Sequence, residues 1–185
     1  MAGIPTARNV DHVGLTVPDM DEAIAFFVDY LGCELAWRVG PFESANDDWM
    51  VENMNVDPRA SCYLAMLRMG PTFNVELFQY TSPDQRQELP KNSDFGGSHL
   101  AIWVDDIDLA AEYLRSVPGV NVQGVPKLVD DGSAAHNNRW CYFTTPWGAQ
   151  MELVSPIGPL KYEETTEIRM APRGPGWSVK QPYAV

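Results

Sequence analysis

The 185-residue sequence is poor in cysteine and has no long apolar run. Its three cysteines, Cys33, Cys62 and Cys141, form no Cys-x-x-Cys pair, and such an odd, scattered set argues against a disulfide framework and predicts a reducing compartment. The longest apolar run, Ala23 to Val28, is far too short to span a bilayer. The N-terminal segment has no stretch typical of a signal peptide. These absences predict a soluble, cytoplasmic protein with no membrane partner.

Basic residues are also scarce. The 13 Lys and Arg residues oppose 25 Asp and Glu residues, which gives a formal net charge of −12. An acidic chain repels phosphate backbones, and the sequence has no Lys/Arg cluster that would offset the repulsion. We therefore expect no nucleic-acid partner. The length and a hydrophobic share of 45% suit one compact domain, or two small modules that share a core.

One pattern occurs twice in the sequence. The segment HVGLTVPDMDEAIAFF, which begins at His12, is echoed by HLAIWVDDIDLAAEYL, which begins at His99. The segment FNVELFQY around Glu76 is echoed by AQMELVSP around Glu152. Each half therefore opens with a histidine in a strand-like run and closes with a glutamate in another, and this repeat predicts two related structural modules.

The hydrophobic periodicity predicts the order β-α-β-β-β in each half. In the first half, either Asp19 or Asp21 caps the helix, Gly32 ends it, and 40–58 is expected to be an irregular inserted loop that could cover a site. The strands expected there are 9–17, 34–39, 61–69 and 73–80. In the second half we expect strands 98–104, near 120–125, 139–145 and 149–155, with a helix at 107–117.

The predicted fold class is α+β, with two tandem βαβββ modules that form an open half-barrel. The modules are expected to cover 8–80 and 97–156, joined by a linker at 81–96 and followed by a C-terminal extension at 157–185. All of these segments are predicted to form one compact domain. A curved sheet of this kind brings the inward faces of its first and last strands to one cleft.

The two glutamates are the most unusual residues of this pattern. A single histidine in a strand is usually structural, and a single glutamate can face solvent from an edge strand. Glu76 and Glu152, however, stand in apolar strands at matching places, and a buried carboxylate needs a partner, a metal or a wet cavity. We therefore predict that His12, Glu76, His99 and Glu152 bind one divalent metal ion. Imidazole and carboxylate suit Zn²⁺, Ni²⁺, Co²⁺, Mn²⁺ or Fe²⁺, among which the sequence does not choose.

The sequence resembles the vicinal oxygen chelate superfamily, which includes glyoxalase I, methylmalonyl-CoA epimerase, extradiol dioxygenases and the bleomycin and fosfomycin resistance proteins. The resemblance is carried by VDHVGLTVPDMDEAIAFF, FNVELFQY, GGSHLAIWVDDIDLAAEYL and RWCYFTTPWGAQMELVSP. It implies a metal held by the four residues named above. The ligand set is most similar to that of bacterial-type glyoxalase I, whereas the epimerase usually has Gln at the place of Glu76. The resemblance also implies a homodimer.

Four protein ligands on an octahedral ion leave two adjacent positions for a substrate with neighbouring oxygens, such as a hydroxyketone. The metal would stabilise an enediolate, and the resemblance suggests Glu152 as the base, with Glu76 on the opposite face of the substrate. The predicted activity is that of a metal-dependent isomerase, epimerase or lyase acting on a small molecule.

Two alternatives stay open at this point. One is an extradiol Fe(II) dioxygenase, for which Tyr142, ten residues before Glu152, and His136 are candidate site residues, although Glu76 would occupy the place that O₂ needs. The other is a non-catalytic drug-binding protein of the resistance type. Trp103 and Phe78 are expected either in the wall of the pocket or in the core, and three arginines could hold a substrate carboxylate: Arg38, Arg68 and Arg139.

Overall fold

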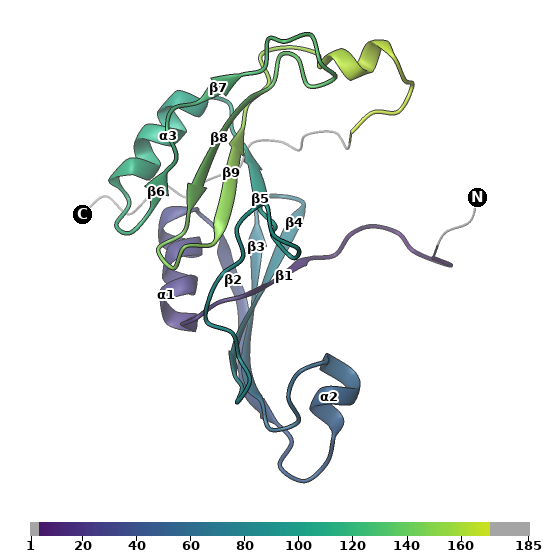
Figure 1. Cartoon of the computed structure of the whole chain (residues 1–185), viewed down its shortest axis with the longest axis vertical. Coiled ribbons are helices and arrows are strands. Elements are labelled where there is room, and N and C mark those ends of the chain that lie inside the picture. Colours follow the sequence, from purple (N-terminus) through teal and green to yellow (C-terminus); the bar gives the residue numbers. More distant parts are fainter. Residues whose placement is uncertain (1–3, 171–185) are drawn as a thin grey trace. The chain divides into compact units, whose positions relative to one another are not determined.

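The computed structural model describes residues 4–170 and has a mixed α+β architecture, as the sequence predicts. The chain divides between Gln85 and Arg86 into two compact units, called unit 1 and unit 2 below. Each unit contains one sheet, and neither sheet closes into a barrel. Figure 1 labels the elements of both units.

Unit 1 has the predicted βαβββ order with one added helix (Figure 1). Its sheet has the strand order β1-β4-β3-β2, in which β1 runs parallel to β4 and the other neighbours are antiparallel. A π-helical segment, Phe26–Tyr30, follows directly on α1. The elements are β1 (Val13–Thr16), α1 (Met20–Ala25), β2 (Glu34–Glu43), α2 (Trp49–Met54), β3 (Ser61–Met69) and β4 (Phe73–Thr81).

Unit 2 repeats this order, but its second strand is broken in two. The sheet order is β5-β9-β8-β6, with β7 also paired to β8, and β5 runs parallel to β9. The strand predicted near 120–125 is present as the short strand β6, which ends before Gly124, with φ +71°, and a second short strand, β7, follows beyond the predicted range. The elements are β5 (Leu100–Trp103), α3 (Ile107–Ser116), β6 (Asn121–Val122), β7 (Lys127–Leu128), β8 (Arg139–Thr144), β9 (Gln150–Val154) and the 3₁₀ helix η2 (Lys161–Glu164).

A helix follows the first strand of each unit, and an aspartate caps the N-terminus of each of these two helices. The Asp19 carboxylate accepts a hydrogen bond from the Glu22 backbone N–H at 2.8 Å, so Asp19 rather than Asp21 is the N-cap. The Asp106 carboxylate likewise accepts bonds from two backbone N–H groups in the first turn of α3. These caps satisfy donors that a helix leaves unpaired. Gly32, with φ +73°, follows the end of the helical segment of unit 1.

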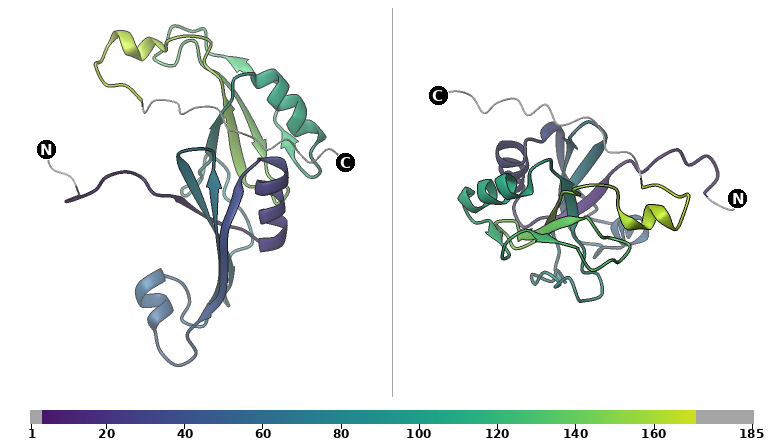
Figure 2. Two further views of the ribbon diagram at one scale, coloured as in Figure 1. Left: turned by 180° about the vertical axis from the view of Figure 1, so that it is seen from behind. Right: turned by 90° about the horizontal axis from the view of Figure 1, so that it is seen from above.

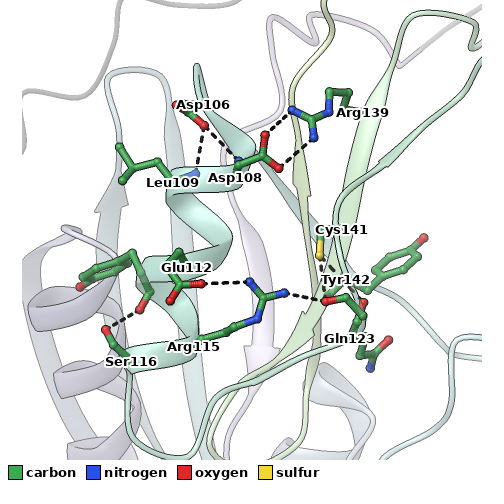
Figure 3. Close-up of polar contacts among 12 residues, drawn as sticks. Asp106, Asp108, Leu109, Glu112, Arg115, Ser116, Gln123, Arg139, Cys141 and Tyr142 are labelled. Atoms are coloured by element: carbon green, nitrogen blue, oxygen red, sulfur yellow. Dashed lines mark hydrogen bonds and ion pairs between the residues drawn. The ribbon is translucent and has the colours of Figure 1, made fainter.

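Helix α3 of unit 2 packs on its sheet through charged as well as apolar contacts (Figure 3). The Arg139 guanidinium on β8 donates two hydrogen bonds to the Asp108 carboxylate, at 2.8 and 2.9 Å. Arg115 donates to the Gly124 carbonyl oxygen at 2.6 Å. Figure 2 shows α3 running along the sheet of unit 2. The helix buries three side chains, namely Ile107, Ala111 and Leu114.

The irregular loop predicted at 40–58 is wrong. Strand β2 continues to Glu43, and the segment then forms the six-residue helix α2. Met50 of α2 is fully buried, and Arg59 donates hydrogen bonds to the backbone carbonyls of Ala45 and Asp47. These tertiary contacts order a stretch whose polar composition resembles a loop. In Figures 1 and 2, α2 lies at the far end of the β2–β3 hairpin.

The thiol of Cys33 makes the stability of the protein depend on pH. Burial raises its pKa from 9.0 to about 12. Above pH 9 the unfolded chain therefore loses a proton that the native chain keeps, so the free energy of unfolding falls as pH rises. We expect ionisation of this thiol in the unfolded chain to lower the free energy of unfolding by about 1.4 kcal/mol for each pH unit above pH 9, up to about pH 12. Urea denaturation under reducing conditions, from pH 8 to 11, should give a shallower decline for Cys33→Ala than for the wild type; equal slopes would contradict the prediction.

Within residues 4–170, no helix is both long and apolar enough to cross a membrane.

Candidate metal and proton-transfer site

The sheet of unit 1 brings His12 and Glu76 together. Because β1 and β4 are parallel neighbours with Gly14 in register with Glu76, the residue just before β1 lies beside the glutamate. His12 Nε2 lies 3.1 Å from Glu76 Oε2. Glycine at position 14 avoids a close contact, since a Cβ atom there would lie 3.3 Å from the Phe78 ring.

The sheet of unit 2 repeats the arrangement with His99 and Glu152. Here β5 and β9 are parallel, and Ala101 is in register with Glu152. His99 Nε2 lies 3.2 Å from Glu152 Oε2. In both units the histidine comes two residues before the register partner of the glutamate. The sequence repeat is therefore also a repeat of side-chain geometry.

The spacing of the donor atoms in each pair suits a metal ion. Two donors that lie about 2.1 Å from one ion at a right angle are about 3.0 Å apart. The two observed separations, 3.1 and 3.2 Å, are close to that value and are also those of a direct His–Glu hydrogen bond. Both glutamate side chains are 14% exposed, and both histidines are more than a third exposed. The sequence predicts that each glutamate needs a partner, a metal or a wet cavity, and in each unit the largely buried carboxylate lies beside an imidazole.

Burial and neighbouring groups shift the pKa values of side chains in and beside these pairs. His12 Nδ1 donates to the Asp11 carboxylate at 2.9 Å, and this bond is the main cause of a raised pKa at His12, which burial opposes and Glu76 supports. An outer carboxylate on Nδ1 also fixes the ring so that Nε2 faces the ligand position. Burial raises the pKa of Glu152, and His99 opposes that shift. Burial also raises the pKa of Tyr142, with Glu152 adding to the rise.

Each unit thus supplies one histidine and one glutamate. Among residues 4–170, no group of three or more His, Cys, Asp or Glu side chains could hold a metal ion. A single site with all four residues remains a prediction, because it requires one pair from each unit. Within each unit, the structure places the predicted ligands together.

The other candidate residues occupy different environments. Trp103 is 37% exposed and therefore does not belong to the core, and Phe78 is half-buried and stacks on Tyr80 at 5.6 Å between ring centroids. Tyr142 is in register with Glu152 and meets the His99 ring edge-on, at 5.1 Å between centroids. His136 lies in a loop of unit 2, where its Nδ1 accepts a long hydrogen bond from the Gly132 N–H. The three candidate arginines, Arg38, Arg68 and Arg139, are each paired with a carboxylate of their own unit.

Comparison with known proteins gives the family. Residues 11–142 match the model of the Glyoxalase/Bleomycin resistance protein/Dioxygenase superfamily. The chain belongs to this superfamily. A relative from Actinomyces sp, named 2-epi-5-epi-valiolone epimerase, is 49% identical over 176 residues, which cover 95% of this chain and 94% of the relative. This identity over the full length supports an enzyme of the isomerase or epimerase kind within the superfamily.

Two solved structures of the superfamily share the fold. A glyoxalase family protein from Bacillus cereus has a TM-score of 0.61 at 20% identity, covering 84% of this chain and 100% of that protein. A fosfomycin resistance protein from Listeria monocytogenes, determined with Mn(II) and sulfate, has a TM-score of 0.53 at 16% identity, with coverage of 86% and 99%. At such identities the likeness establishes the glyoxalase fold alone.

Sequence reasoning missed Asp11 as a member of the site. The alternation of the first strand predicts that Asp11 shares the apolar face with Val13 and Leu15, opposite to His12. In the structure both residues precede β1, and the Asp11 carboxylate turns to the imidazole. The useful signal was a carboxylate directly adjacent to a candidate metal-binding histidine. Outer carboxylates of this kind are common at metal sites in proteins.

Proposed function

We propose that this protein is an epimerase of a hydroxyketone, with 2-epi-5-epi-valiolone or a closely similar ketone as its substrate. The observation that carries the proposal is the duplicated His–Glu pair, present in a chain that is 49% identical to a protein named for this activity. The same similarity favours an epimerase over the dioxygenase and over the drug-binding protein.

The donor set fits a divalent cation. Two imidazole nitrogens and two carboxylate oxygens are ligands that Zn²⁺, Ni²⁺, Co²⁺, Mn²⁺ and Fe²⁺ accept. We propose that His12, Glu76, His99 and Glu152 hold one such ion. When bound, it would supply Lewis-acid stabilisation of the negative charge that develops on the substrate oxygens. The Asp11 carboxylate supports this role by orienting the His12 ring.

The glutamates are the groups that can move a proton. A C–H bond next to a ketone carbonyl is acidic because its electron pair can move onto the carbonyl oxygen. We propose that a Glu152 carboxylate oxygen accepts this proton, and that Glu76, carrying a proton taken from solvent, donates that proton to the opposite face of the carbon. Both carboxylates are largely shielded from water, and burial raises the pKa of Glu152, which makes that carboxylate a stronger base.

Deuterium exchange tests the reaction. In D₂O the protein should remove the NMR signal of the proton next to the carbonyl of 2-epi-5-epi-valiolone, and an epimer carrying deuterium at that carbon should accumulate. Boiled protein should produce neither change. Consumption of O₂ with a catechol panel on the Fe²⁺-loaded protein, without exchange into the ketone, would replace the epimerase by the dioxygenase.

A further inference from the structure

Uncharged polar side chains form a row across the sheet of unit 2. Asn121 on β6 is in register with Thr144 on β8, which is in register with Gln150 on β9. Gln150 stands two residues before Glu152, so the alternation of side chains along a strand places the row on the face of the sheet that carries Glu152. The row therefore lies beside Glu152, the proposed base, on the same face of the sheet of unit 2.

A fourth side chain fixes one end of this row. Gln123 Nε2 donates to Gln150 Oε1 at 3.2 Å, and Gln150 Nε2 donates to the Phe143 carbonyl at 3.4 Å. In Figure 3 the side chains of Gln123 and Tyr142 lie on the side of β8 that faces away from α3. The Gln150 amide is thus held in place, as a recognition group must be.

The row keeps hydrogen-bonding capacity to spare. In residues 4–170, the Thr144 hydroxyl and the Asn121 amide have no side-chain hydrogen bond, and Gln123 Oε1 accepts none. Hydroxyl and amide groups together can both donate to and accept from an alcohol. The row has no formal charge, so it suits a neutral hydroxyl group better than a carboxylate or a phosphate.

At the equivalent positions of unit 1, the polar side chains already pair with other groups of that unit. Glu34, Arg68 and Asn74 stand in register two residues before Glu76. Arg68 pairs with Glu34, and Asn74 Nδ2 donates to the Asp11 carbonyl at 3.0 Å. The remainder of that face is largely apolar, with Trp37, Leu64, Met66 and Phe78. The two units therefore carry equivalent His–Glu pairs in chemically different surroundings.

We propose that Asn121, Thr144 and Gln150, with Gln123 as a positioning residue, recognise the hydroxyl groups of the substrate that are remote from the reacting carbon. This inference rests on the proposed function and adds the source of its specificity. A site built to hydrogen-bond a hydroxyl discriminates strongly against an analogue that lacks it, because the polar groups of the protein then lose their partner.

Two ketones separate recognition from chemistry. The first is the polyhydroxylated 2-epi-5-epi-valiolone, and the second is 2-hydroxycyclohexanone, which lacks the remote hydroxyl groups. The variants are Thr144→Val, which keeps the shape of the side chain, and Gln123→Leu, at an exposed position. With the first ketone each should raise KM for deuterium exchange about five- to tenfold, the loss of one hydrogen bond, with little change in kcat. With the second ketone neither constant should change.

A matched control is Thr81→Val in unit 1. It removes a hydroxyl from the face of that sheet opposite to Glu76, where Thr81 is in register with Ser61. It should leave both constants unchanged for both ketones. If the wild type exchanges both ketones but the variants change KM equally for the two, or for neither, the recognition role is overturned while the proposed function stands. If the wild type exchanges neither ketone, both proposals are overturned together.

Discussion

Replacement of Glu152 by glutamine is expected to lower kcat for proton exchange by about 10²- to 10⁴-fold, the usual contribution of a positioned general base. Glutamine keeps the shape of the side chain, but its amide does not accept a proton at neutral pH. The loss should appear in kcat, because the carboxylate acts on the proton that is transferred rather than on the remote parts of the substrate. Deuterium incorporation at saturating ketone measures it directly.

The same variant has a second readout that separates chemistry from folding. Because burial raises the pKa of Glu152, the native site favours a neutral group there, and in chelator-treated protein, where the loss of a metal ligand has no effect, Glu152→Gln should unfold at a temperature no lower than the wild type. Glu164→Gln is the matched control, since Glu164 lies exposed in η2 of the same unit. It should retain full activity. A Glu152→Gln protein that folds normally and exchanges at the wild-type rate would remove Glu152 from the proposed mechanism.

The sequence predicts the paired modules well because the repeat gives the same information twice. The first helix, expected to begin at Asp19 or Asp21, and the strands 61–69 and 73–80 were predictable from capping and periodicity, which depend on neighbouring residues. Helix α2 could not be predicted in this way. Its order depends on the burial of Met50 and on hydrogen bonds from Arg59 to carbonyls 12 and 14 residues earlier, and periodicity reveals neither.

The candidate site was likewise predictable from the sequence only in part. The repeat identifies all four predicted ligands, because a carboxylate within an apolar strand is anomalous on sequence alone. The partners of these residues are not anomalous in the sequence. Asp11 resembles a surface residue, and Gln123 and Gln150 resemble ordinary strand or loop residues. The proposed roles of Gln123 and Gln150 depend on the register of β6, β8 and β9, which fixes the neighbours of a side chain and cannot be read from periodicity.

Substitution of His12 or His99, each of which directly precedes the first strand of its unit, is expected to abolish metal binding. Elemental analysis of untagged wild-type protein should find about one divalent ion per chain, and His12→Ala and His99→Ala should each retain less than about a tenth of it, because the loss of one of the four ligands lowers the affinity for the ion. The third histidine gives the control. His136 lies outside both His–Glu pairs, so His136→Ala should keep the full metal content.

The pattern of loss distinguishes one shared ion from two separate ones. If both pairs bind the same ion, His12→Ala in unit 1 and His99→Ala in unit 2 should lose metal to the same extent, and a chelator should lower the melting temperature of the wild type but of neither variant. If each pair binds its own ion, each variant should lose half of the metal and still respond to the chelator. Unchanged metal content in both variants would remove the two pairs from metal binding altogether, and the glutamates would then have to act as proton carriers without a bound cation.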